Sequence, residues 1–213
     1  MKLYSYWRSS CSWRVRIALA YKGLNYDYCS VHLTENGGEQ HSEIHRQRNP
    51  MAQVPVLENA DGLQLSQSMA ILEYLEEKYP QLPLLPLEAW DRAQARQLAE
   101  MVNAGIQPLQ NLAVLKQLAK DASINTRDWA RTQISTGLDA LEAVVERKGG
   151  DFLVGDAPSF AELCLVPQLY NARRFECDLA RWPRLLRAEN AANGIHAFQI
   201  THPDYQPDAA QAA

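Results

Sequence analysis

The sequence lacks any apolar run long enough to cross a bilayer, so we expect a protein that does not span a membrane. Its N-terminus, Met1-Lys2-Leu3-Tyr4, also lacks the apolar core of a secretory signal peptide, and we expect a cytoplasmic location. There is no excess of positive charge. The formal net charge of −4 argues against a nucleic-acid-binding protein that depends on phosphate contacts. Apolar residues make up 46% of the chain, enough for a packed core.

Cysteine is scarce and forms no recognisable metal or redox pattern. No C-x-x-C pair and no Cys/His cluster with zinc spacing occurs among Cys11, Cys29, Cys164 and Cys177. In a reducing compartment the simplest state of all four is a free thiol. His41 and His45 have the i, i+4 spacing of a helical metal pair, but no third ligand accompanies them. We therefore expect no metal site.

Strand and helix patterns divide the chain into two parts. In the first part we expect strands over 2–6, 26–32, 54–58 and 63–65, helices over 12–22 and 68–79, and a loop or short helix over 35–48. Asp61-Gly62 favours a hairpin between the last two strands. A proline-rich stretch favours an extended linker, and only helical patterns follow it, to about Asn193. The predicted fold is an α/β domain over 1–80, a linker over 81–88 and an all-α domain over 89–213, whose tail after Ile200 is irregular.

Two hydroxyls and a thiol stand where the first predicted strand meets the first helix. The order is Arg8-Ser9-Ser10-Cys11. Backbone N–H groups at a helix N-terminus are unpaired, and the helix dipole places partial positive charge there. A thiolate bound at such a point is stabilised, and a hydroxyl can donate to it. The simpler interpretation is that these serines only cap the helix, which is their usual role.

Two further junctions carry weaker signals. Val54-Pro55 opens a predicted strand, and a proline cannot donate to a strand ladder. If the bond is cis, the backbone groups of Val54 can pair with a peptide-like ligand, although most X–Pro bonds are trans. Gln67-Ser68 begins the next predicted helix and suits a carboxylate, or is a simple cap.

The order of these features resembles the cytosolic glutathione transferases: a strand, a helix that starts S-S-C-S-W-R-V-R-I-A-L, a V-P strand, a Q-S helix and an all-helical domain. The first motif resembles the zeta class, the maleylacetoacetate isomerases. Similar segments continue along nearly the whole chain: Asn49-Pro50-Met51, Gln53-Val54-Pro55, IQPLQNL at 106–112, Val154-Gly155-Asp156, LCLVPQ at 163–168 and His202-Pro203. The resemblance implies a thioredoxin-like N-terminal domain, an all-α C-terminal domain and a homodimer.

The same resemblance implies glutathione as cofactor and assigns residues to it. Ser9 would donate its hydroxyl to the glutathione sulfur, with Ser10 and Cys11 assisting as the other expected catalytic residues. Val54, before a cis Pro55, would pair with the cysteinyl backbone of glutathione. Gln67 and Ser68 would hold its γ-glutamyl end. The other expected glutathione-site residues are Arg14, Gln40, Gln107 and Asn111.

The implied reaction is the cis–trans isomerisation of maleylacetoacetate to fumarylacetoacetate in tyrosine and phenylalanine breakdown. Its substrate is a dianion, so the site needs cations, and Arg8 and Arg174 are the expected substrate-binding residues. Arg173 is adjacent to Arg174 on a helix and is expected to point elsewhere.

Several alternatives remain open. The same site could isomerise maleylpyruvate or dehalogenate small α-haloacids. Cys11 could be the nucleophile and form mixed disulfides, as in omega-type enzymes. The chain could also be a non-catalytic binding scaffold, although the motif serines are present. Ser159 and Glu162 match a capping box, which we interpret as a folding signal with no chemistry.

Overall fold

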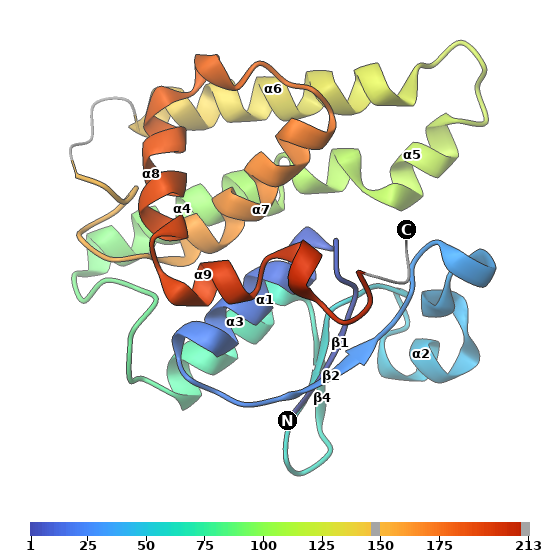
Figure 1. Ribbon diagram of the computed structural model, residues 1–213, viewed down its shortest axis with the longest axis horizontal. Coiled ribbons are helices and arrows are strands. Elements are labelled where there is room, and N and C mark those ends of the chain that lie inside the picture. The colour runs from blue at the N-terminus through green and yellow to red at the C-terminus, as the bar shows by residue number, and fades with distance from the viewer. Residues whose placement is uncertain (146–149, 210–213) are drawn as a thin grey trace. The chain divides into compact units, whose positions relative to one another are not determined.

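The computed structural model describes residues 1–145 and 150–209 (Figure 1). Its contacts divide the chain into two compact units: Met1–Pro83 together with the segment that begins at Gly194, and Leu84–Asn193. The limits expected from sequence assigned all of 89–213 to the helical domain. The last segment groups with the first unit instead, because α9 (His196–Ile200) packs on α1 (Ser10–Tyr21).

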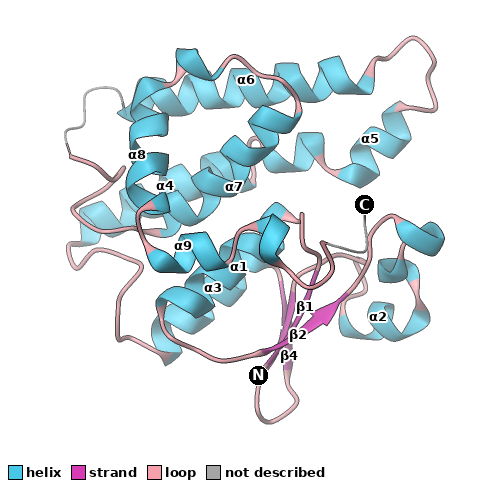
Figure 2. Ribbon diagram, viewed as in Figure 1, coloured by secondary structure: helices cyan, strands magenta, loops and turns pink. Residues whose placement is uncertain are grey.

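A four-stranded mixed sheet forms the centre of the first unit, as the thioredoxin-like prediction requires (Figure 2). Its strands are β1 (Lys2–Ser5), β2 (Asp27–Ser30), β3 (Val56–Glu58) and β4 (Gln64–Ser66), in the order β2-β1-β3-β4. β1 and β2 run parallel and are joined through α1, whereas β3 runs antiparallel to both β1 and β4. The α/β interpretation of this part of the chain is confirmed.

Side chains alternate between the two faces of this sheet. One face carries Ser5, which accepts a hydrogen bond from Arg16 on α1, and α1 packs against α3 (Ser68–Lys78). The other face carries an apolar cluster that includes Tyr4 and Val31. The polar segment expected to be a loop or short helix forms η1 (Glu35–Gly37), η2 (Glu39–His41) and α2 (Glu43–Arg48).

The stretch expected to be an extended linker is anchored at its start. The ammonium of Lys22 donates to the carbonyls of Tyr79, Gln81 and Leu82 at 2.9, 3.4 and 3.2 Å. It also pairs with the carboxylate of Glu76 at 2.7 Å. A buried lysine that meets several oxygens fixes the direction in which the chain leaves α3.

The second unit is helical throughout its described part. Its elements are α4 (Ala89–Asn103), η3 (Gln107–Gln110), α5 (Leu112–Leu118), α6 (Thr126–Val145), α7 (Phe160–Arg174), η4 (Leu179–Arg181) and α8 (Pro183–Asn193). The predicted capping box at the start of α7 is confirmed, because Glu162 accepts from the Ser159 N–H at 2.8 Å while Ser159 Oγ accepts from the Ala161 N–H at 3.2 Å. None of the described helices has the length and apolarity needed to cross a bilayer.

Candidate active site

Three junctions meet at one edge of the sheet because of its register. Tyr4 near the end of β1 lies opposite Val56 at the start of β3, and Val56 lies opposite Ser66 at the end of β4. The segments that follow β1, precede β3 and follow β4 therefore leave the sheet at the same edge. These are the segments in which sequence analysis placed the expected glutathione contacts of the first domain, apart from Gln40.

Ser9 is the N-cap of α1, and its neighbours form the first turn. The Ser9 backbone is extended, with φ −68° and ψ 118°, and its Oγ accepts the Ser12 N–H at 3.2 Å. The helix therefore begins at Ser10, two residues before the expected start, because the cap sets the boundary. Ser9, Ser10 and Cys11 are all half-buried. Capping uses a lone pair of the Ser9 oxygen and leaves its O–H able to donate, so the capping and functional interpretations are compatible.

The turn between β1 and Ser9 is held by two residues that sequence analysis did not assign to the site. The buried guanidinium of Arg16 donates to the carbonyls of Tyr6 and Trp7 at 3.3 and 2.8 Å. The carboxylate of Asp208 accepts from the Trp7 N–H at 3.0 Å and from the Tyr28 hydroxyl at 2.7 Å. Burial lowers the pKa of Arg16 and raises the pKa of Tyr28. Arg8 extends from the same turn, with Cζ 5.1 Å from the centroid of the Trp7 ring.

The Val54–Pro55 peptide bond is cis, as the resemblance implied. No backbone hydrogen bond joins Val54 to another residue within 1–145 and 150–209. Gln40 is buried, and its Nε2 donates to the Leu33 carbonyl at 3.4 Å. Its Oε1 accepts no hydrogen bond from any described residue. Gly38 leaves room for this amide, because a Cβ at Gly38 would lie only 2.6 Å from its Nε2 and Oε1 atoms.

Gln67 and Ser68 form the start of α3. Gln67 has a φ of 71°, a left-handed conformation that is costly for a residue with a side chain. Such backbone strain is commonest where function requires a fixed geometry. The Ser68 hydroxyl is buried and accepts from Arg14 Nη1 at 3.2 Å. Arg14, on α1, therefore supports the start of α3.

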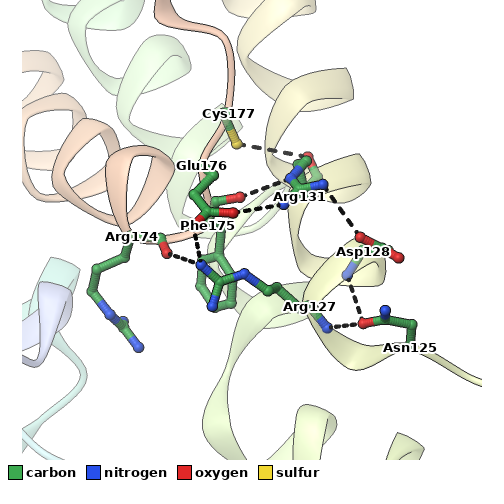
Figure 3. A network of polar contacts seen from close by, with 8 residues as sticks. All are labelled: Asn125, Arg127, Asp128, Arg131, Arg174, Phe175, Glu176 and Cys177. Atoms are coloured by element: carbon green, nitrogen blue, oxygen red, sulfur yellow. Dashed lines mark hydrogen bonds and ion pairs between the residues drawn. The ribbon is translucent and has the colours of Figure 1, made fainter.

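The remaining predicted residues belong to the second unit. Gln107 begins η3, and Asn111 is the N-cap of α5, with its Oδ1 accepting the Ala113 N–H at 3.1 Å. Arg174 ends α7, is exposed, and donates to Asn171 Oδ1 at 3.1 Å. Figure 3 shows its guanidinium directed away from the neighbouring network of Arg127, Asp128, Arg131 and Glu176.

Arg173 is paired with a residue outside the candidate site, as expected from the sequence. It binds the carboxylate of Glu189 on α8 with two hydrogen bonds, at 2.6 and 2.5 Å. The carboxylate side chain raises the pKa of Arg173. Arg173 is thus held in an ion pair with Glu189, so of these two adjacent arginines only Arg174 remains a candidate for binding substrate.

The fold and the sheet edge define a protein of the glutathione transferase class, and residues 1–77 match the family model of the glutathione S-transferase N-terminal domain. The maleylacetoacetate isomerase of Dictyostelium discoideum is 48% identical over 209 residues, covering 97% of this chain and 95% of that protein. The zeta-class glutathione S-transferase of Euphorbia esula is 44% identical over 210 residues, covering 98% and 92%.

The solved structures that resemble this chain come from the same family as these sequence relatives. The maleylacetoacetate isomerase of Anaeromyxobacter dehalogenans with bound glutathione is 53% identical, with a TM-score of 0.89 over 98% of this chain and 97% of that one. A bacterial zeta-class maleylpyruvate isomerase is 40% identical, with a TM-score of 0.93 over 98% and 100%. The chain belongs to the zeta class of glutathione transferases, the family of the maleylacetoacetate isomerases.

Proposed function

We propose that this protein catalyses the glutathione-dependent cis–trans isomerisation of maleylacetoacetate to fumarylacetoacetate, a step in tyrosine and phenylalanine catabolism. The observation that carries the proposal is the geometry of Ser9, which caps α1 while its O–H stays able to donate. The names of the relatives support the substrate, and the bound glutathione in the Anaeromyxobacter enzyme supports the cofactor.

The residues at the sheet edge fit glutathione. The N–H and C=O of Val54 have no backbone partner among the described residues, as suits a site that pairs with the main chain of a peptide. The buried Gln40 Oε1 needs a donor, and the amide N–H groups of a tripeptide supply one. Gln67 and Ser68 at the start of α3 would hold the γ-glutamyl end. Gln107 and Asn111 are proposed as further contacts from the second unit.

Ser9 would act by making the cofactor thiol a better nucleophile. Glutathione supplies a thiolate that adds to the conjugated double bond, permits rotation about it and leaves again. A free thiol has a pKa of about 8.5, so only a few per cent is thiolate at pH 7. The Ser9 O–H would donate to the sulfur, and the N-terminus of α1 would favour its negative charge. Ser10 and Cys11 lie in the same turn and would assist, while Arg14 would keep Ser68 in place.

Two arginines would bind the dianionic substrate. Arg8 precedes Ser9 directly, and no carboxylate pairs with its guanidinium in the described part of the chain. Arg174 is exposed at the end of α7, and its planar guanidinium suits a carboxylate. The maleylacetoacetate isomerase of Anaeromyxobacter dehalogenans was solved with dicarboxyethyl glutathione and citrate in its active site, which supports a carboxylate-binding site here.

Maleylpyruvate is the second candidate substrate, because a zeta-class maleylpyruvate isomerase is 40% identical to this chain and shares its fold with a TM-score of 0.93. The test is to measure isomerisation of both compounds with and without glutathione. We expect fast turnover of maleylacetoacetate only when glutathione is present. Preference for maleylpyruvate would keep the chemistry and change the pathway, and turnover of neither would refute the proposed activity.

We also propose that the protein is a homodimer in the cytoplasm, since its resemblance to the cytosolic glutathione transferases implies both. Light scattering during gel filtration would test the dimer. A mass of about 24.0 kDa, the mass of one chain, would contradict it.

A further inference from the structure

A cavity of about 640 Å³ lies between β2 and α2, on the sheet face that carries Tyr4. Its lining comes from β1, β2 and the segment from η1 to the end of α2, all within the first unit (Figure 1). None of the residues expected to bind glutathione or substrate lines it. The cavity is therefore separate from the residues assigned to glutathione and substrate, and nothing in the proposed isomerisation uses it.

Arg48 provides the positive charge in this cavity. Its Cζ lies 4.2 Å from the centroid of the Tyr4 ring, a cation–π distance. No hydrogen bond or ion pair to another residue in the described ranges engages its guanidinium. A guanidinium has five N–H donors, and a cation–π contact with a ring occupies none of them with a hydrogen-bond acceptor. Such a group is suited to a carboxylate.

His45 provides a hydrogen-bond acceptor beside that charge. Its side chain is only 2% exposed, and its Nε2 lies 3.0 Å from the carbonyl oxygen of Gln53. A carbonyl can only accept, so Nε2 carries a proton, and in the neutral imidazole Nδ1 then carries a lone pair. That Nδ1 is buried and has no partner within the described residues. A buried acceptor without a donor is rare in folded proteins, and here it belongs to a residue that lines a cavity.

The two groups have a fixed relation to each other and to an apolar wall. His45 and Arg48 are three residues apart on α2, so they share one face, with Cβ atoms about 5–6 Å apart. Tyr4, Val31 and Ile44 contribute apolar surface to the lining, and Cys29 contributes a thiol. The occupant should therefore carry a carboxylate, a hydrogen-bond donor and a flat apolar surface.

We propose that the cavity between β2 and α2 binds a small hydroxylated aromatic carboxylate, with its carboxylate on Arg48, its ring beside Tyr4 and Val31, and its hydroxyl donating to His45 Nδ1. This inference does not depend on the proposed isomerisation, because it uses different residues. It adds a ligand site behind the segment that carries Gln40, since Gly38 both lines the cavity and contacts the Gln40 amide.

Cys29 gives a local readout of occupancy. It lines the cavity, so a bound ligand should shield it from iodoacetamide, and peptide mass spectrometry reports its alkylation separately from that of the other cysteines. Burial raises the pKa of this thiol, so the reaction is run at about pH 8.5. The probe is 4-hydroxybenzoate, and S-methylglutathione is added to occupy the proposed glutathione site. We expect saturable protection of Cys29 by at least fivefold. Absence of protection, or its loss when S-methylglutathione is added, would overturn the proposal.

Matched ligands and variants test each contact. Benzoate, which lacks the hydroxyl, and phenol, which lacks the carboxylate, should each bind at least tenfold more weakly than 4-hydroxybenzoate. Arg48→Gln should abolish protection, whereas Arg46→Gln, which removes the same charge from an exposed position on α2, should leave it intact. Equal effects of the two variants would refute the role of Arg48. Equal affinity of benzoate and 4-hydroxybenzoate would refute the role of His45 without requiring any variant to fold.

Discussion

The carboxylate of Asp208 accepts a hydrogen bond from the backbone N–H of Trp7 at 3.0 Å, across 201 positions of sequence. Asp208 is 2% exposed, and its second oxygen accepts from the Tyr28 hydroxyl. Trp7 lies two residues before Ser9, so this contact holds the turn that presents the motif serines.

Asp208→Ala should lower both stability and glutathione affinity. The variant removes the acceptor from half-buried donors on Trp7 and Tyr28, which costs about 1–3 kcal/mol in free energy of unfolding. The freed turn should also raise the KM for glutathione. Urea unfolding and steady-state kinetics measure the two effects. Asp204→Ala, at an exposed position in the same segment, is the control and should change neither. A normal KM in a destabilised Asp208→Ala would show a purely structural contact.

Substitutions of Ser9 can separate its cap from its proposed chemistry. Ser9→Ala removes the cap of α1 and should cost about 1 kcal/mol of stability, whereas Ser9→Gly should cost only a few tenths, because glycine is a tolerable cap. Both should reduce glutathione-dependent kcat/KM by about 100-fold, a typical cost for losing an electrostatic donor. Cys11→Ala should keep most of the activity. Loss of activity in Cys11→Ala with retention in Ser9→Ala would reverse the assigned roles and favour a thiol nucleophile.

The adjacent arginines at the end of α7 should respond differently to loss of charge. Arg174→Gln should raise the KM for a dianionic substrate about tenfold with little effect on unfolding, since its side chain is exposed. Arg173→Gln breaks the pair with Glu189 and should lower stability while leaving the KM unchanged. The ratio of the two KM values is the measurement. A higher KM in Arg173→Gln than in Arg174→Gln would contradict the assignment. Arg8→Gln should resemble Arg174→Gln.

Gln67→Gly should raise the stability of the protein and also raise its KM for glutathione. Glycine adopts a φ of 71° without the steric cost that glutamine bears, so we expect a gain of about 0.5–1 kcal/mol in free energy of unfolding. The side chain proposed to hold the γ-glutamyl group is lost, so the KM for glutathione should rise. Thermal unfolding measures the change in stability, and steady-state kinetics on the same preparation measure the KM for glutathione. A stabilised variant with an unchanged KM would show that the Gln67 side chain does not bind the cofactor.

Glu58 should make stability depend on acid pH. Hydrogen bonds from Gln64, then Lys2 and Tyr4, lower the pKa of its carboxyl from 4.5 to about 2. A lowered pKa means that the ionised form stabilises the fold above pH 4.5, and that this contribution is lost as the pH falls towards 2. Glu58→Gln should therefore be less stable than the wild type at pH 6, by an amount that shrinks between these limits.

Gln64→Leu removes the hydrogen bond that lowers the pKa of Glu58 most, and it should therefore weaken the dependence of stability on pH. Urea titrations at a series of pH values give both comparisons. Parallel stability curves for the wild type and Glu58→Gln would show that the cross-strand contacts do not act on this carboxyl.

Local signals allowed much of the fold to be predicted from sequence. The Asp61-Gly62 hairpin and the capping box at Ser159 depend on neighbouring residues only, and both are present. The α1 boundary was misplaced by two residues because three serines within four positions, Ser9, Ser10 and Ser12, could each cap the helix, and only the observed hydrogen bond selects Ser9.

Nonlocal contacts could not be predicted in the same way. The bonds from Arg16 and Asp208 to the turn before Ser9 join residues far apart in sequence, and the segment that carries Asp208 has no periodic pattern. The left-handed backbone of Gln67 was equally hidden, because that conformation usually indicates glycine or asparagine. The site residues themselves were assigned through a family resemblance, and their individual roles remain proposals.

The return of the last segment to the first unit has a consequence for protein synthesis. Residues 1–83 leave the ribosome early, but the turn before Ser9 lacks its contact to Asp208 until residue 208 has also emerged. An N-terminal domain generally folds first during translation. Here such early folding should yield a sheet whose turn before Ser9 is incompletely fixed, so we expect competence for glutathione only after residue 208 has left the ribosome.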